Sequence, residues 1–340
     1  ELSVNEWRNN IINRLSNKNN LKIITSTTLF AYMHYNYLLA IQELNPSKGY
    51  QKKNNIRQII WKIRAKKVIL ATGSIERPLT FNNNDRPGIM LANSASKFLN
   101  YYGVCVGKKV IVFTNNDSAY QTAIDFHQKG ITVQAIVDVR SESQGDLPQR
   151  AKSLGLKIYN NHAITNTSGR LKIQTVAINK INDSFKNIDI STKVIKCDLL
   201  CISGGWTPTV HLFTQSRGKL IYREKDTTFI PHESFQDCLS IGACNGTFAL
   251  DEILNETFAK TNSIFIDFNI KTSITQKYKS ESVTVGRLKH AWLIPSSQHI
   301  GKTKMFVDFQ NDVTAKDIKL ALKEGYRSIE HIKRYTTTGM

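Results

Sequence analysis

The stretch Lys109-Val-Ile-Val-Phe113, followed some way on by the second apolar run Ile131-Thr-Val-Gln-Ala-Ile-Val137, decides the fold class of this chain. The residues between the two runs carry apolar side chains at helical spacing and stop at a glycine: Tyr120, Ala123, Ile124 and Gly130. The connection exceeds the dozen or so residues that a crossover to a parallel strand needs. We therefore predict an α/β fold with a Rossmann-like parallel sheet.

Three other apolar runs end in small residues and glycine: Ala71-Thr72-Gly73, Ser203-Gly204-Gly205 and Ser240-Ile-Gly242. A glycine after a strand lets a bound nucleotide approach the backbone closely, and a helix that begins there can face an anion. The order of these runs is typical of FAD/NAD(P)-binding enzymes with two dinucleotide-binding domains, one inserted into the other. We predict that two-dinucleotide-domain fold.

The same runs set the predicted domain boundaries. Residues 1–103 and 206–260 are predicted to form a nucleotide-binding domain that is incomplete and N-terminally truncated, since it lacks its first strand and phosphate loop. Residues 104–205 are predicted to form the inserted Rossmann-like domain, and residues 261–300 a linker. Residues 301–340 are predicted to form a small helical module, whose first helix begins at a capping box from Thr314 to Asp317.

Composition excludes several classes of protein. The chain has 46 Lys and Arg against 27 Asp and Glu, a net charge of +19, but the basic residues are dispersed, and we expect no nucleic-acid partner. No apolar run approaches the roughly 20 residues of a membrane span, so we expect no membrane partner. The five cysteines include no Cys-x-x-Cys pair, and they favour free thiols in a reducing cytoplasm. We expect no metal site.

The inserted domain departs from the dinucleotide fingerprint at the turn that follows its first strand. Thr114, Asn116 and Ala119 stand where G-x-G-x-x-G requires small or flexible residues. A side chain at the second position blocks the approach of a pyrophosphate, and Asp117 adds negative charge there. We predict that this domain binds no dinucleotide and that Asp138 is an ordinary acid at the end of a strand. Asp117 or Ser118 is predicted to cap the helix.

Several strings resemble one family: Lys67-Val-Ile-Leu-Ala-Thr-Gly-Ser-Ile-Glu-Arg-Pro78, Gly204-Gly-Trp-Thr-Pro-Thr-Val-His-Leu-Phe213, Phe306-Val-Asp-Phe-Gln-Asn-Asp-Val-Thr-Ala-Lys-Asp317 and His331-Ile-Lys-Arg-Tyr-Thr-Thr-Thr-Gly-Met340. Together they are similar to the alpha subunit of heterotetrameric sarcosine oxidase over about residues 60–340. The resemblance implies that the chain is an internal fragment. The family's ferredoxin-like start and its C-terminal folate-binding domain are both missing from it.

The resemblance also implies an activity and a set of partners. Beta, gamma and delta subunits accompany alpha, and the substrate is sarcosine, which is oxidatively demethylated to glycine with H2O2 production. FAD lies in the beta subunit, FMN lies at the interface with beta, and NAD lies in alpha. Tetrahydrofolate accepts the methylene group in the missing C-terminal domain. We expect no catalytic residue within this fragment.

The resemblance places two sites on this sequence. The NAD site comprises Ala71, Thr72, Gly73 and Gly242. Because Ala243 replaces the acid that bonds the ribityl chain in related flavoproteins, NAD is expected there rather than FAD. The FMN and interface site comprises residues of the final module, where opine-oxidising relatives carry cluster-binding cysteines: Asn311, Asp312, Thr314, Lys316, Arg334, Thr336, Thr337 and Thr338.

Alternative interpretations remain at this stage. The final module is equally consistent with a solvated polar turn. An amine, opine or proline dehydrogenase alpha subunit is a related enzymatic alternative. A scaffold subunit without catalytic function is the alternative from a different class.

Overall fold

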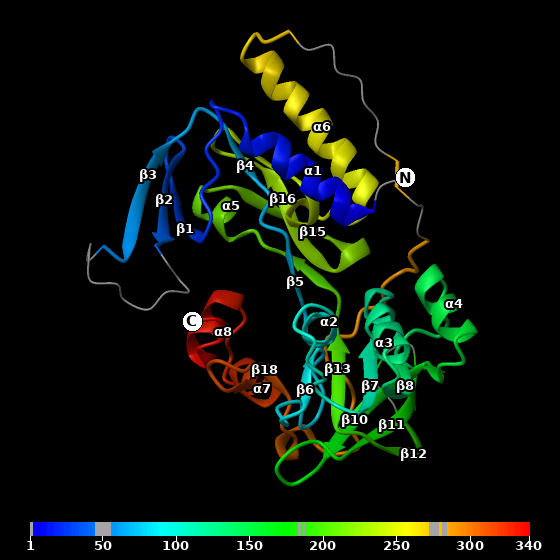
Figure 1. Ribbon diagram of the computed structural model, residues 1–340. Coiled ribbons are helices and arrows are strands. Elements are labelled where there is room, and N and C mark those ends of the chain that lie inside the picture. Colours follow the sequence, from blue (N-terminus) through cyan, green and yellow to red (C-terminus); the bar gives the residue numbers. More distant parts are fainter. Residues whose placement is uncertain (1–2, 45–55, 183–184, 186–187, 272–278, 281–283) are drawn as a thin grey trace.

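The computed structural model describes residues 3–44, 56–182, 185, 188–271, 279–280 and 284–340. Two lobes are joined by β5 (Ser74–Glu76), which pairs antiparallel with β14 (Trp206–Pro208), and a small C-terminal module lies beside the second lobe (Figure 1). At β5 and β14 two crossings of the chain between the lobes thus lie side by side.

The described part of the first lobe contains three small sheets. Strands β1 (Thr27–Met33), β2 (Tyr37–Glu43) and β3 (Gln58–Arg64) form an antiparallel sheet. Strands β4 (Val68–Leu70) and β17 (Cys238–Ser240) form a parallel pair, and β15 (Lys219–Arg223) pairs with β16 (Thr228–Glu233). The helices are α1 (Val4–Ser16), α5 (His211–Gln215) and α6 (Leu250–Asp267), with short η1 (Glu224–Asp226) and η2 (Gly242–Asn245).

The second lobe is built on a five-stranded sheet in the order β6-β13-β7-β8-β9, with every neighbouring pair parallel. Its strands are β6 (Ile89–Leu91), β7 (Lys109–Thr114), β8 (Thr132–Asp138), β9 (Ile158–Asn160) and β13 (Leu199–Ser203). The predicted Rossmann-like α/β fold is confirmed. The connection of β7 to β8 through a helix is the crossover that the sequence indicated.

The two faces of this sheet bury different partners because side chains alternate along a strand. Val110 and Val112 pack with the helices α2 (Ala92–Asn100), α3 (Ser118–Gln128) and α4 (Asp146–Ser153). Ile111 and Phe113 pack with an antiparallel sheet of β10 (His162–Ser168), β11 (Thr175–Ile181) and β12 (Ile188–Lys196). All four side chains are fully buried, so β7 is central to the core of the lobe.

Residues 89–100 pack with the second lobe, although the predicted domain division assigns them to the nucleotide-binding domain. Strand β6 pairs with β13, and α2 packs against α3, so residues 89–100 complete the five-stranded sheet and its helical layer. The predicted boundary at residue 104 lies after them. Apolar periodicity does not reveal which neighbouring sheet a three-residue strand joins.

After α6 the chain returns to the second lobe as an extended strap, residues 284–294, and then forms the module. The module consists of η3 (Ile300–Lys302), a hairpin of β18 (Phe306–Asp308) and β19 (Val313–Thr314), and helices α7 (Ala315–Lys323) and α8 (Ile329–Thr336). The predicted capping box is present: the Thr314 hydroxyl and amide both donate to Asp317 Oδ2, at 2.6 and 2.8 Å. Within the described residues, no helix is long and apolar enough to span a membrane.

Candidate functional site

The carboxyl edge of β4 and β17 brings the predicted NAD residues together. Leu70 pairs with Ser240 in the parallel ladder, and the Ile241 amide donates to the Leu70 carbonyl at 2.9 Å. Ala71 and Gly242 therefore follow adjacent strand ends. Gly73 and Gly242 have φ of +75° and +70°, a backbone conformation that favours glycine. A Cβ at Gly73 would meet no atom within 4 Å, so this edge is open to a ligand.

Thr72 and Gly73 also anchor the second crossing of the chain. The Thr72 hydroxyl donates to the Thr209 carbonyl at 2.7 Å, and the Thr209 amide donates to the Gly73 carbonyl at 2.9 Å. Ala71 and Thr72 remain exposed. This edge therefore combines a fixed backbone with solvent-facing small residues, and it fits the close approach of a nucleotide.

A carboxylate that the sequence analysis missed lies at the same edge. Glu256 on α6 accepts hydrogen bonds from the Gly242 amide at 2.9 Å and from Lys260 Nζ at 2.8 Å, and it also binds the Asn245 amide. Burial raises the pKa of Glu256, but the bonds from Lys260, Gly242 and Asn245 outweigh burial and hold the pKa below its ordinary value. An ionised carboxylate thus faces the site, and ribose hydroxyls are the groups that such a carboxylate binds in dinucleotide domains.

The corresponding edge of the second lobe is filled by a buried ion-pair network. Arg140 Nη1 lies 2.6 Å from Asp117 Oδ1, and Arg140 Nη2 lies 2.7 Å from Asp138 Oδ2. The Tyr120 hydroxyl donates to Asp138 at 2.7 Å. The two Asp side chains are 3% and 0% exposed. Burial lowers the pKa of Arg140, but the bonds to Asp138 and Asp117 outweigh burial and raise the pKa above its ordinary value.

Two details here correct the sequence analysis. Asp138 is not an ordinary strand-end acid, because it is fully buried and accepts hydrogen bonds from Tyr120 and Arg140. Neither Asp117 nor Ser118 caps α3 with its side chain; instead Asn116 Oδ1 accepts from the Ser118 amide at 3.0 Å. Asp117 is occupied by Arg140, and Asn116 fills the turn. That no dinucleotide binds at this turn stays a prediction.

The strap covers the same turn from outside. The Gly286 amide donates to Asp117 Oδ2 at 2.5 Å, and the Lys289 amide donates to the Asn115 carbonyl at 3.2 Å. Asn115 Nδ2 donates back to the Lys289 carbonyl at 2.9 Å. The strap thus occupies the position that a pyrophosphate takes in dinucleotide-binding members of this fold.

Most residues predicted for the FMN and interface site form hydrogen bonds within the module. Asn311 Nδ2 donates to Asp308 Oδ2 at 2.9 Å and to the Met340 carbonyl at 3.3 Å. The Thr336 and Thr338 hydroxyls lie 2.7 Å apart, and the Thr337 hydroxyl donates to the Thr336 carbonyl at 2.6 Å. Asp308, which the sequence analysis did not single out, also accepts from the Gly339 amide at 2.7 Å.

These bonds lower the Asp308 pKa to about 2, chiefly through the Asn311 side chain and the Gly339 amide. Asp308 therefore joins the turn before β19 to the end of α8. The cationic members of the predicted set, Lys316 and Arg334, are exposed, as are Asp312 and Thr337.

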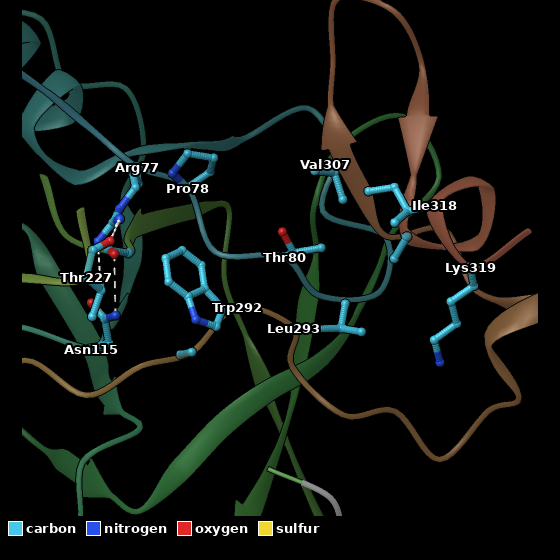
Figure 2. A pocket seen from close by; sticks show the side chains of 13 residues that line it. Arg77, Pro78, Thr80, Asn115, Thr227, Trp292, Leu293, Val307, Ile318 and Lys319 are labelled. Carbon is cyan, nitrogen blue, oxygen red and sulfur yellow. Dashed lines mark hydrogen bonds between the residues drawn. The ribbon is translucent and has the colours of Figure 1, made fainter. Parts of the chain in front are cut away.

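A cavity of about 380 Å³ opens between the second lobe, the strap and α7 (Figure 2). Its lining comprises Arg77, Pro78, Thr80, Asn115, Gly204, Thr227, Ala291, Trp292, Leu293, Val307, Ala315, Ile318 and Lys319. Arg77 Cζ lies 5.3 Å from the centre of the Trp292 ring. Gly204 lies in one of the glycine-ended runs noted in the sequence, but no lining residue belongs to the predicted NAD or FMN sites. No cluster of His, Cys, Asp and Glu suited to a metal ion occurs among the residues the structure describes.

Comparison with known proteins now identifies the relatives of the chain. Residues 302–340 match the sarcosine oxidase A3 domain. The sarcosine oxidase subunit alpha of Rhizobium meliloti (strain 1021) is 32% identical over 322 residues, which is 94% of this chain and 31% of that protein. The sarcosine oxidase subunit alpha of Corynebacterium sp. (strain U-96) is 33% identical over 340 residues, 98% of this chain and 34% of that protein. This chain is homologous to the alpha subunits of sarcosine oxidases.

The chain spans about a third of the length of those alpha subunits. Among solved structures, L-proline dehydrogenase from P. horikoshii aligns with a TM-score of 0.61 at 19% identity, covering 96% of this chain and 58% of that one. Bacillithiol disulfide reductase from Staphylococcus aureus aligns with a TM-score of 0.53 at 12% identity, covering 78% and 76%. At these identities the likeness establishes the fold alone, which is the predicted FAD/NAD(P)-binding fold.

Proposed function

We propose that this chain is the nucleotide-holding and FMN-shaping part of the alpha subunit of a sarcosine oxidase. The observation that carries the proposal is the 32–33% identity over 92–98% of the chain to three sarcosine oxidase alpha subunits. The reaction of the complete enzyme converts sarcosine, tetrahydrofolate and O2 into glycine, methylene-tetrahydrofolate and H2O2. Beta, gamma and delta subunits in the cytoplasm complete the assembly, with FAD in beta and tetrahydrofolate in the C-terminal domain of alpha.

The proposed NAD site is the edge of β4 and β17, at Ala71, Thr72, Gly73 and Gly242. Its exposed small residues and positive-φ glycines suit a nucleotide backbone. Ala243 supplies no carboxylate for a ribityl chain, and the carboxylate at this edge is that of Glu256 on α6, which accepts from the Gly242 amide. Glu256 is positioned by Lys260, and we expect it to accept hydrogen bonds from a ribose. The Arg140 ion pairs and the strap fill the corresponding edge of the second lobe, which supports placing NAD at the first lobe.

The proposed FMN contacts lie on the module, and the hydrogen bonds divide the predicted residues by role. Asn311 joins the hairpin to the end of the chain through Asp308 and the Met340 carbonyl, and Thr314 bonds Asp317 at the start of α7. Thr336, Thr337 and Thr338 bond one another at the end of α8. Lys316 and Arg334 are exposed cations on that frame. A flavin phosphate needs charge-assisted hydrogen bonds, so these two residues are the ones we expect to contact it. Asp312 and Thr337 lie exposed beside them in sequence.

Amine oxidation by the beta subunit, measured with and without the complete alpha subunit, tests the proposal. We expect alpha to be required for FMN retention and for oxygen-linked turnover. Lys316→Met or Arg334→Met should release FMN or slow electron transfer between the flavins, while sarcosine still reduces the FAD. Lys323→Met, at the exposed end of α7, is the matched control and should retain FMN. Equal FMN content and transfer rates in all three variants would leave alpha with the scaffold function instead.

A further inference from the structure

The cavity described above lies where an α/β sheet most often binds ligands. Asn115 follows β7 and Gly204 follows β13. The switch point of the sheet lies between these two strands: β8 and β9 follow on one side of β7, whereas β13 and β6 lie on its other side. Ligands of open parallel sheets bind in the crevice beyond the carboxyl ends of the strands at such a switch point. The strap fills the part of this crevice above Asp117 and leaves the part between Arg77 and α7 open.

Arg77 brings a positive charge to this cavity without an ion-pair contact to a carboxylate of the described residues. Its guanidinium donates to the Thr227 carbonyl at 2.6 Å, to the Thr227 hydroxyl at 2.7 Å and to the Asp226 carbonyl at 3.4 Å, all of them uncharged acceptors. The Asp226 carboxylate pairs with Arg223 instead. Arg77 Nε is buried without an acceptor among the described residues. Burial lowers the pKa of Arg77, and this effect outweighs the opposing attraction of the nearby Asp226.

A second cation lies at the opposite end of the cavity. Lys319 on α7 is exposed, and Figure 2 shows it well separated from Arg77, with Thr80 and Leu293 between them. Across the part of the chain that the structure describes, neither Arg77 nor Lys319 has an acidic group within 4.0 Å. Both ends of the cavity thus favour negative charge.

The walls between the two cations are largely apolar. Pro78, Trp292, Leu293, Val307 and Ile318 supply them. Trp292 is 59% exposed although its ring lies at a cavity, and an exposed indole face is suited to stacking a flat group. An apolar lining with a few convergent polar groups is the usual composition of a small-molecule site, and 380 Å³ is at the lower end of the usual volumes.

We infer that this cavity binds a small organic anion that carries a carboxylate and a flat apolar body. The carboxylate lies toward Arg77, the flat body packs between Trp292 and Ile318, and Lys319 supplies long-range attraction at the entrance. A dinucleotide is excluded because the strap occupies the adjoining crevice through Gly286 and Lys289. The site is separate from the edge of β4 and β17 and from the exposed cations proposed for FMN.

Calorimetric titration of the native assembly with benzoate tests the inference, with the neutral benzamide and inorganic phosphate as comparison ligands. Saturating sarcosine is present throughout and O2 is excluded, so that the substrate site is occupied without turnover. We expect one benzoate per copy of this chain, with benzamide and phosphate at least tenfold weaker. Arg77→Met should weaken benzoate at least tenfold, because a charge-assisted hydrogen bond is lost. Lys319→Met should weaken it only about threefold, and mainly at low salt.

Matched controls separate this site from the proposed oxidase function. Lys323→Met, one turn beyond Lys319 on α7, should bind benzoate as the unaltered protein does. The KM for sarcosine and the FMN content should be the same in Arg77→Met and the unaltered protein, so either proposal can fail alone. If Arg77→Met unfolds, Trp292→Ala provides the second test and should weaken benzoate at least threefold. Benzoate binding that is absent, or that is unchanged in Arg77→Met and Trp292→Ala, would overturn the inference.

Discussion

Replacing Arg140 with Met tests the buried network of the second lobe most directly. Arg140 bridges Asp117 at 2.6 Å and Asp138 at 2.7 Å, and both Asp side chains are at most 3% exposed. Met retains the aliphatic volume but leaves two carboxylates buried without a cation. Removing one partner of a buried ion pair costs about 3–5 kcal/mol. Since whole domains are stable by only about 5–15 kcal/mol, we expect Arg140→Met to remove a large fraction of the stability of this lobe.

Urea unfolding at neutral pH, combined with hydrogen exchange of the amides in β7 and β8, measures this loss. Arg150 on α4 is exposed, so Arg150→Met is the control and should change the free energy of unfolding by at most about 0.5 kcal/mol. Adding Asp117→Asn and Asp138→Asn to Arg140→Met removes the stranded charges and should restore at least half of the loss. An Arg140→Met variant within about 1 kcal/mol of the unaltered protein would refute the reasoning.

Three further predictions concern the cofactor, the backbone and pH. Acid extraction of the complete alpha subunit, produced without beta, should release NAD, and a stoichiometric flavin spectrum would contradict the proposed site. Gly88→Ala should lower the free energy of unfolding by at least about 2 kcal/mol more than Gly103→Ala. Both glycines have positive φ, but only at Gly88 would a Cβ clash, at 2.7 Å from Ile173 Cγ2. Glu256 has a lowered pKa in the folded protein, so the stability that it contributes is present above its ordinary value of 4.5 and is lost as pH falls below it. In Glu256→Gln, the free energy of unfolding measured in urea should therefore fall less on acidification through this range. A pH profile identical to that of the unaltered protein would contradict the hydrogen bonds assigned to Glu256.

Local pattern was sufficient to predict the central strands and the capping box. The apolar runs at 109–113 and 131–137 became β7 and β8 with shifts of a residue at their ends, because a strand buried on both faces must be apolar throughout. The box at Thr314 formed as predicted, because its hydrogen bonds span only three residues. Such interactions are encoded within a single turn, and the sequence displays them directly.

Contacts distant in sequence were not predictable in this way. Gly286 and Asp117 are 169 residues apart, and Asp308 and Gly339 are 31 apart. Neither pair has a periodic or compositional signature, so the strap and the Asp308 junction emerged only from the structure. Arg140 follows two residues after Asp138, and an acid at the end of a second strand suggests a ribose ligand as readily as an ion pair. The nearby Asn116 and Asp117 were the residues that pointed away from a dinucleotide.

The two lobes end their central strands in the same way but differ in what covers those ends. At β4 and β17 the small residues Ala71 and Thr72 are exposed, and a carboxylate from α6 is already ionised beside them. The turn after β7 is filled by the Asn116 side chain and covered by the strap, and Arg140 neutralises the charge of Asp117 there. The strap also contributes Trp292 to the wall of the anion cavity. A single segment thus covers the turn of the second lobe and shapes the cavity beside it, and we expect a nucleotide bound by this chain to lie at the first lobe.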